Sequence, residues 1–156
     1  TLSSSSAASD VYKRQTRGAV TTDDSTNRII LFDGRFDTGY RVVEFKIAPH
    51  VVDSSESRNY GAKLMTDDDA TSGTNWNWDN NEEIAWALFN HDGNDVRSDF
   101  DYSRVDPDNL IVQDLYIRAF DQQGRDQKLN YFIRLEKYDI SDSQGALAMV
   151  RNRSQA

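Results

Sequence analysis

The fold is decided by Leu110–Ala119 (LIVQDLYIRA) and Leu129–Tyr138 (LNYFIRLEKY), two runs in which apolar and polar residues alternate. The apolar positions share one face of each run: Ile111, Leu115, Ile117 and Ala119 in the first, and Leu129, Tyr131, Ile133 and Leu135 in the second. Successive side chains of a strand point to opposite sides of a sheet, so this pattern predicts two half-buried antiparallel strands. The polar connection between them, Asp121–Gln127, contains Gly124 and predicts a hairpin turn.

Other strands are predicted upstream, where short apolar or alternating runs are separated by turn residues. The candidates are Arg28–Phe32, Tyr40–Ile47, Tyr60–Met65, Ile84–Asn90 and the weaker edge strand Val96–Val105. Asp33-Gly34 is the favoured dipeptide of a type I′ hairpin, and Pro49 should end the second strand. Ile84–Asn90 is apolar on both faces, which predicts a central strand covered on both sides, whereas Thr66–Glu83 reads as a long polar loop.

The end of the chain changes from a period of two to the period of a helix. Ser141 and Gln144 have the spacing of a capping box, and apolar residues share one face after them. We therefore expect a short helix at about Asp142–Arg153. With six to eight strands, the predicted fold is an all-β antiparallel β-sandwich or jelly-roll-like domain with a short C-terminal helix.

The first fifteen residues differ in composition from the rest. Thr1–Ser9 is nearly all Ser, Ala and Thr, and Ser9–Gln15 (SDVYKRQ) resembles translated sequencing-adapter DNA from environmental reads. We expect residues 1–15 to be a disordered, non-native leader, with an ordinary flexible tail as the alternative. Residues 16–156 are then one β-sandwich domain, a length that suits a single core.

Composition limits the classes of partner. The 156 residues carry a net charge of −8, and such a surface repels phosphate backbones, which argues against nucleic acid. No stretch approaches the roughly 20 apolar residues of a membrane helix. The absence of cysteine excludes disulfides, thiolate metal sites and cysteine nucleophiles.

No motif for catalysis or nucleotide binding is present, and we expect no enzymatic activity. The two histidines, His50 and His91, fall beside a proline and in a turn, where exposed loop positions are the rule. Asp92, Asn94 and Asp95 offer the oxygen ligands that Ca²⁺ takes, as does Asp67–Asp69, but neither matches the EF-hand spacing. Solvated turns are the favoured interpretation, and no cofactor is expected.

Trp76 and Trp78 alternate with Asn and Asp in the segment NWNWDNNE (75–82). Such rings can fold back onto the loop's own core, anchor an oligomer interface or stack on sugar faces while amides bind hydroxyls. We keep these three interpretations open. Tyr102, on the predicted edge strand, is the third candidate interface or ligand residue.

From Arg28 to the end, the chain resembles short β-rich proteins encoded by marine tailed phages. The segments that carry the resemblance are NRIILFDG (27–34), YFIRLEKY (131–138) and ALAMVRNRSQ (146–155). The resemblance implies a virion structural protein (a minor capsid, decoration, neck or tail component) that forms a homo-oligomer and binds other virion proteins; it supplies no site residues.

The alternative from another class is a carbohydrate-binding β-sandwich module that uses Trp76 and Trp78. For the virion protein, net charge alone predicts that salt strengthens self-association, because it screens the repulsion between acidic copies.

Overall fold

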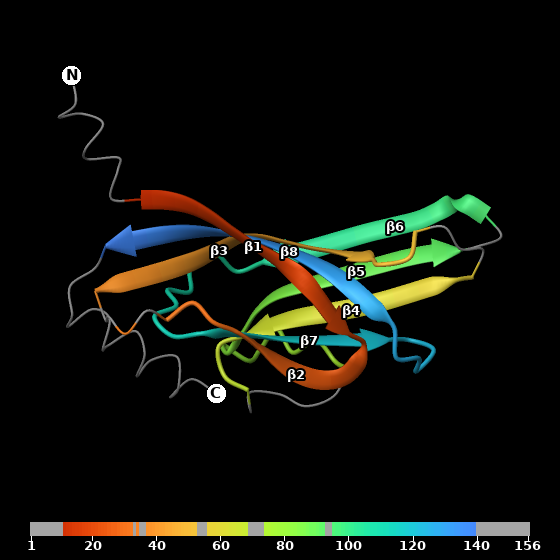
Figure 1. Cartoon of the computed structure of the whole chain (residues 1–156), viewed down its shortest axis with the longest axis horizontal. Helices are drawn as coiled ribbons and strands as arrows, with labels where there is room; N and C mark the ends of the chain where they lie inside the picture. Colours follow the sequence, from red (N-terminus) through yellow and green to blue (C-terminus); the bar gives the residue numbers. More distant parts are fainter. Residues whose placement is uncertain are drawn as a thin grey trace, which may run out of the picture.

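The computed structural model describes residues 11–32, 34, 37–52, 56–68, 74–92 and 95–139, which form two antiparallel β-sheets (Figure 1). The three-stranded sheet has the order β1-β8-β3, with strands Val11–Thr21, Lys128–Asp139 and Thr38–Pro49. The five-stranded sheet has the order β2-β7-β4-β5-β6, with strands Asp23–Ile29, Leu115–Asp121, Arg58–Met65, Glu83–Asp92 and Asp95–Val105. No helix occurs among the described residues, so the prediction of an all-β antiparallel protein is confirmed for them.

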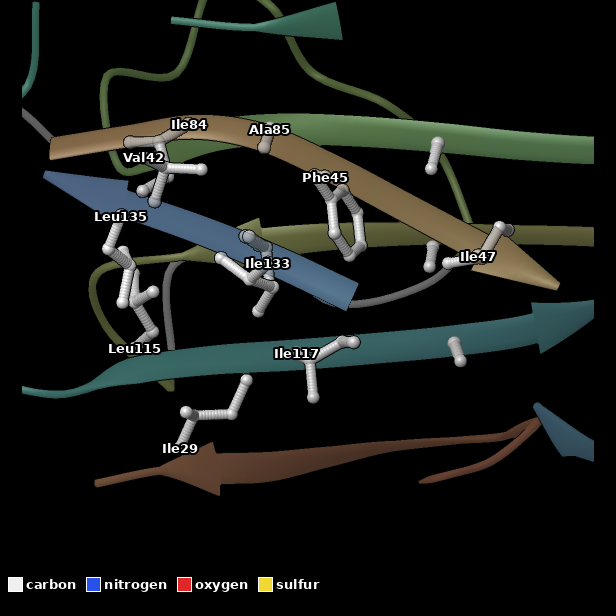
Figure 2. Close-up of a cluster of buried hydrophobic side chains, with 14 of the residues drawn as sticks. Ile29, Val42, Phe45, Ile47, Ile84, Ala85, Leu115, Ile117, Ile133 and Leu135 are labelled. Atoms are coloured by element: carbon white, nitrogen blue, oxygen red, sulfur yellow. The ribbon is translucent and has the colours of Figure 1, made fainter. Parts of the chain in front are cut away.

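The core lies between the two sheets, which face each other as in a β-sandwich (Figure 2). Phe45 and Ile133 of the three-stranded sheet, and Leu115 and Ile117 of the five-stranded sheet, have no exposed side-chain surface. The predicted apolar face of the two deciding runs is also confirmed: all its members are buried except Tyr131, which is half-buried against the core. The alternation therefore identified the side of each strand that meets the opposite sheet.

The predicted hairpin between the two deciding runs is wrong. β7 belongs to the five-stranded sheet and β8 to the three-stranded sheet, so the connection between them crosses from one layer to the other. Alternation tells which face of a strand is buried, but it does not tell which strand is its neighbour. The first strand also begins later than predicted, at Leu115, while Ile111 forms an isolated bridge with Tyr40 of β3.

The β1–β2 and β7–β8 connections both cross between the sheets, and they lie side by side. Thr22, between β1 and β2, donates its N–H to the carbonyl of Gln127 and its hydroxyl to the carbonyl of Arg125, each at 2.8 Å. In return, the N–H of Gln127 donates to the Thr22 hydroxyl at 2.9 Å. Gly124 has φ +73°, a left-handed conformation that suits glycine. The turn residue was correctly identified, but it belongs to an arch between sheets.

The hairpin predicted at Asp33-Gly34 is also wrong, because β2 and β3 lie in different sheets. β2 ends at Ile29, and the following backbone N–H groups of Leu31 and Phe32 donate to the carboxylate of Asp114. A side-chain acceptor thus replaces the strand partner that a hairpin would supply.

Predictions for the middle of the chain agree better with the structure. β5 lies inside the five-stranded sheet and β6 at its edge, with Asp92 and Asp95 paired where the chain reverses. Pro49 is the last residue of β3, as predicted. Unbroken alternation with Phe45 and Ile47 would bury Val43, but Val43 is 37% exposed and Val42 is buried, because a β-bulge between Val42 and Glu44 shifts the alternation by one residue.

The second part of the leader predicted at residues 1–15 lies in a strand, whereas its non-native origin stays a prediction. Val11–Gln15 belong to β1 and pair with residues 134–138 of β8, so the strand begins before the predicted boundary at Thr16. Apolar and polar residues do not alternate in β1, and its position depends on backbone hydrogen bonds with β8. Residues 1–10 and the predicted helix at 142–153 lie outside the described residues.

Candidate functional site

The three aromatic residues singled out in the sequence lie on the outer face of the five-stranded sheet, away from the core. Trp76 stacks on Tyr102 of β6, with ring centroids 6.0 Å apart, and Tyr102 stacks on Phe100 at 6.4 Å. Trp78 contacts Trp86 of β5 at 5.5 Å. We call Trp76, Trp78, Trp86, Phe100 and Tyr102 the aromatic surface. The rings pack against the outer face of the sheet, and Trp78 and Phe100 remain 57% and 50% exposed.

A buried ion pair holds the segment that carries these tryptophans. Lys63 of β4 and Glu83 of β5 have fully buried side chains, and the Lys63 Nζ lies 3.2 Å from Glu83 Oε2. Glu83 also accepts hydrogen bonds from the Asn77 N–H, the Asn77 amide and the Trp86 indole N–H, while Lys63 donates to the carbonyl of Asn75. These hydrogen bonds fix the position of the loop, although the buried indole N–H of Trp76 has no hydrogen-bond partner.

Beside the aromatic surface, a cleft of about 320 Å³ opens over β4 and β7. Its floor is Gly61, where the ring of Phe120 lies so close that a Cβ atom would collide with it. Leu88, Asn59 and Gln122 complete much of the wall. This volume is at the lower end of the range for small-molecule sites.

Negative charge collects near the end of β4, on the same outer face. Burial raises the pKa of Glu82, and the nearby Asp67 carboxylate raises it further. Burial likewise raises the pKa of Tyr116, and Asp68 contributes in the same direction. We call the described residues 66–68 and 74–82, with the exposed carboxylates of Asp68 and Asp79, the acidic loop.

The calcium site stays a prediction, because the structure does not describe the side chains of its expected ligands. No group of three or more His, Asp or Glu side chains with metal-binding geometry occurs there. The side chains of Asp92, Asn94 and Asp95 lie outside what the structure describes, as does Asp69. His50 is exposed at the end of β3, and His91 is half-buried in β5.

A second surface, which the sequence did not predict, lies on the outer face of the three-stranded sheet. Strand register places three rows of residues across β1, β8 and β3: Arg17–Phe132–Lys46, then Ala19–Asn130–Ala48, then Thr21–Lys128, with His50 beside Lys128. The small alanines of the middle row leave a groove of about 610 Å³ between rows of longer side chains. We call this the basic groove.

Charge is divided unequally between the sheets. The strands of the three-stranded sheet contain eight Lys and Arg against three Asp and Glu, a net charge of +5 in a chain of net charge −8. The strands of the five-stranded sheet contain six against eight, a net charge of −2. Alternation places Arg17, Lys46 and Lys128 on outward faces, but only the pairing of β1 and β3 with β8 brings them together.

Comparisons with known proteins add little to this geometry. No family model matches the chain, and no curated protein is similar to it. Among solved structures, it is similar to a chain from the structure described as "Bacillus endospore appendages form a novel family of disulfide-linked pili". The identity is 8%, the match covers 84% of this chain and 89% of that chain, and the TM-score is 0.33. No helix long and apolar enough to cross a membrane is found among the described residues.

Proposed function

We propose that this chain is a structural protein of a phage virion and acts by assembling with copies of itself and with other virion proteins. The observation that supports assembly best is the long edge strand β1, of 11 residues, which pairs only with β8 among the described residues. An edge strand presents a row of backbone N–H and C=O groups that can pair with or be covered by another chain. The resemblance to proteins of marine tailed phages supports the virion as the location, in a minor capsid, decoration, neck or tail position.

The strand order supports a jelly-roll-like fold as part of this proposal. β4 pairs with β5, β2 with β7 and β1 with β8, so the pairs are nested around the β4–β5 hairpin. The remaining pair of a rolled hairpin would be β3 with β6, and these edge strands meet through Lys46 and Asp101 at 3.6 Å. Jelly rolls serve as viral capsid domains and as lectin domains, so this topology agrees with both candidate functions.

Assembly is tested with the purified chain and with virus particles. Sedimentation velocity over a range of protein concentrations should show a species heavier than 17.8 kDa, and mass spectrometry should find the chain in particles from the source sample. A strict monomer that is absent from purified particles would overturn the proposal.

A carbohydrate-binding module is the second candidate, and the cleft next to the aromatic surface favours it. A sugar ring in this cleft would meet Phe120 and Leu88, with the amides of Asn59 and Gln122 at its wall. If this candidate is correct, Trp78→Ala and Phe120→Ala should abolish binding to a neutral glycan array, while Val52→Ala, a control at an 81% exposed position away from the cleft, should not. Glycan binding by a strict monomer would favour this candidate over the virion protein.

A further inference from the structure

The cations around the basic groove are poorly neutralised within their own chain. Among the described residues, Arg17 and Lys128 have no ion-pair partner, and Lys46 reaches only Asp101, in a half-exposed pair. Phe132 and Asn130 lie between these cations, and the ring of Phe132 also carries the guanidinium of Arg134 at 5.9 Å. A groove with cations on both walls and a floor of methyl groups and one amide suits an acidic, extended segment of protein.

We propose that the acidic loop of a second copy of this chain occupies the basic groove. This inference rests on the proposed function, because it specifies the contact through which the copies assemble. Charge complementarity supports it: the strands around the groove carry +5, so everything else in the chain together carries −13. Another copy thus offers a partner surface of opposite sign, and the acidic loop presents the exposed carboxylates of Asp68 and Asp79 on the outer face of the other sheet.

The positions of the two surfaces determine the kind of assembly. The groove lies on the outer face of one sheet, at the end where β8 begins. The acidic loop follows the end of β4 on the outer face of the other sheet, and pairing of Met65 with Tyr116 and of Tyr60 with Asp121 places that end away from the start of β8 (Figure 1). Surfaces on opposite faces and opposite ends cannot both meet the same partner, so the contact is head-to-tail and builds a ring or a filament.

Salt dependence separates this contact from simple repulsion between acidic copies. Raising NaCl from about 0.05 M to about 0.5 M should dissociate the assembly, because it screens the attraction between the groove and the loop. Net charge alone predicts the opposite sign. Sedimentation velocity at each salt concentration measures how the size of the assembly changes.

The decisive experiment uses two variants that each destroy one half of the contact. Arg17→Glu/Lys128→Glu reverses the groove, and Asp67→Lys/Asp68→Lys reverses the loop; each variant alone should be monomeric at concentrations where the wild type assembles. Mixed together, they should associate again, because the intact loop of the groove variant can enter the intact groove of the loop variant, and the two reversed surfaces, which are now opposite in sign, can extend the assembly. Lys137→Glu, which reverses one half-exposed lysine at the opposite end of β8 from the groove, is the control for Lys128→Glu and should assemble like the wild type.

Each outcome has a definite meaning. If the wild type assembles and both variants still do, the inference is overturned while the proposed assembly function survives with a different interface. If the variants are monomeric but do not associate when mixed, the head-to-tail contact is excluded. A monomeric wild type whose groove binds heparin oligosaccharide, with loss on Arg17→Glu/Lys128→Glu, would assign the groove to an anionic ligand and overturn the inference, and absence of the chain from purified particles would then overturn the proposed function as well.

Discussion

At the scale of residues, the buried pair of Lys63 and Glu83 is the most sensitive polar feature. We expect Glu83→Gln to lower the free energy of unfolding by about 3–5 kcal/mol, because it leaves the Lys63 ammonium buried without its counter-ion. Lys63→Met/Glu83→Gln should be less destabilised than Glu83→Gln alone. Urea unfolding measures both, and Glu44→Gln, in the exposed pair with Arg134, is the control and should cost about 1 kcal/mol or less. An equal, small effect for both single variants would contradict this account.

Asp114 should make the free energy of unfolding depend on pH in the acidic range. Burial alone would raise the pKa of its carboxyl, but hydrogen bonds from the N–H groups of Phe32 and Leu31 and the pairing with Arg28 outweigh burial and lower it. A pKa that is lower in the folded state gives stability that is present above the unfolded value of 3.8 and lost as pH falls through the folded value. Asp114→Asn should therefore be less stable at pH 7 and should lose less stability below about pH 4.

The measurement for Asp114 is urea unfolding of wild type and variant between neutral pH and about pH 2.5. The control is Asp108→Asn, at an exposed turn position. Parallel pH profiles for wild type and Asp114→Asn would show that the contacts with Leu31, Phe32 and Arg28 do not stabilise the fold.

At the scale of elements, β1 tests where the folded domain begins. Deleting residues 1–15 removes the pairing of Val11–Gln15 with β8, whereas deleting residues 1–10 leaves that pairing intact. At roughly 0.2–1 kcal/mol for each cross-strand pair, the longer deletion should cost about 1–5 kcal/mol more and lower the melting temperature by several degrees. Calorimetry of the two truncated chains gives the difference. Equal melting temperatures would favour the boundary at Thr16 that composition suggests.

The elements also show why strand positions were easier to predict than strand partners. β3 to β6 and β8 were found close to their observed bounds, because hydrophobic alternation and turn residues are local properties of the chain, whereas β7 begins five residues later than predicted. β1 was missed, because an edge strand with few apolar residues forms only where β8 supplies its hydrogen bonds. The β7–β8 and β2–β3 connections were predicted as hairpins, although each crosses between sheets.

At the scale of the whole molecule, the core between the sheets should dominate stability. Ile133 is fully buried on β8, the central strand of its sheet, and Ile133→Ala should cost about 2–5 kcal/mol, measured by chemical denaturation. Ile30→Ala is the matched control, because that isoleucine is 72% exposed and its truncation should stay within about 0.5 kcal/mol. If the two variants were equally stable, the two sheets would not share the core described here.

The candidate sites divide in the same way as the fold. The sequence singled out Trp76, Trp78 and Tyr102 from their residue types. The structure places them on one surface, and the buried Lys63–Glu83 pair holds the loop there. No local sequence pattern predicts that pair. It did not reveal the basic groove, because Arg17, Lys46 and Lys128 are far apart in the chain and the net charge conceals a local excess of cations.

By itself, the sequence determined the all-β class, the buried face of most strands and the locations of most turns. These follow from the period of side chains along a strand and from the backbone preferences of glycine, proline, Asp and Asn. Only the tertiary structure decided which strands are neighbours, where the charges gather and which sheet each strand joins. Which strands pair depends on the free energy of forming the whole core, and residues that are distant in sequence contribute to that free energy together. No single stretch of the chain therefore determines the pairing.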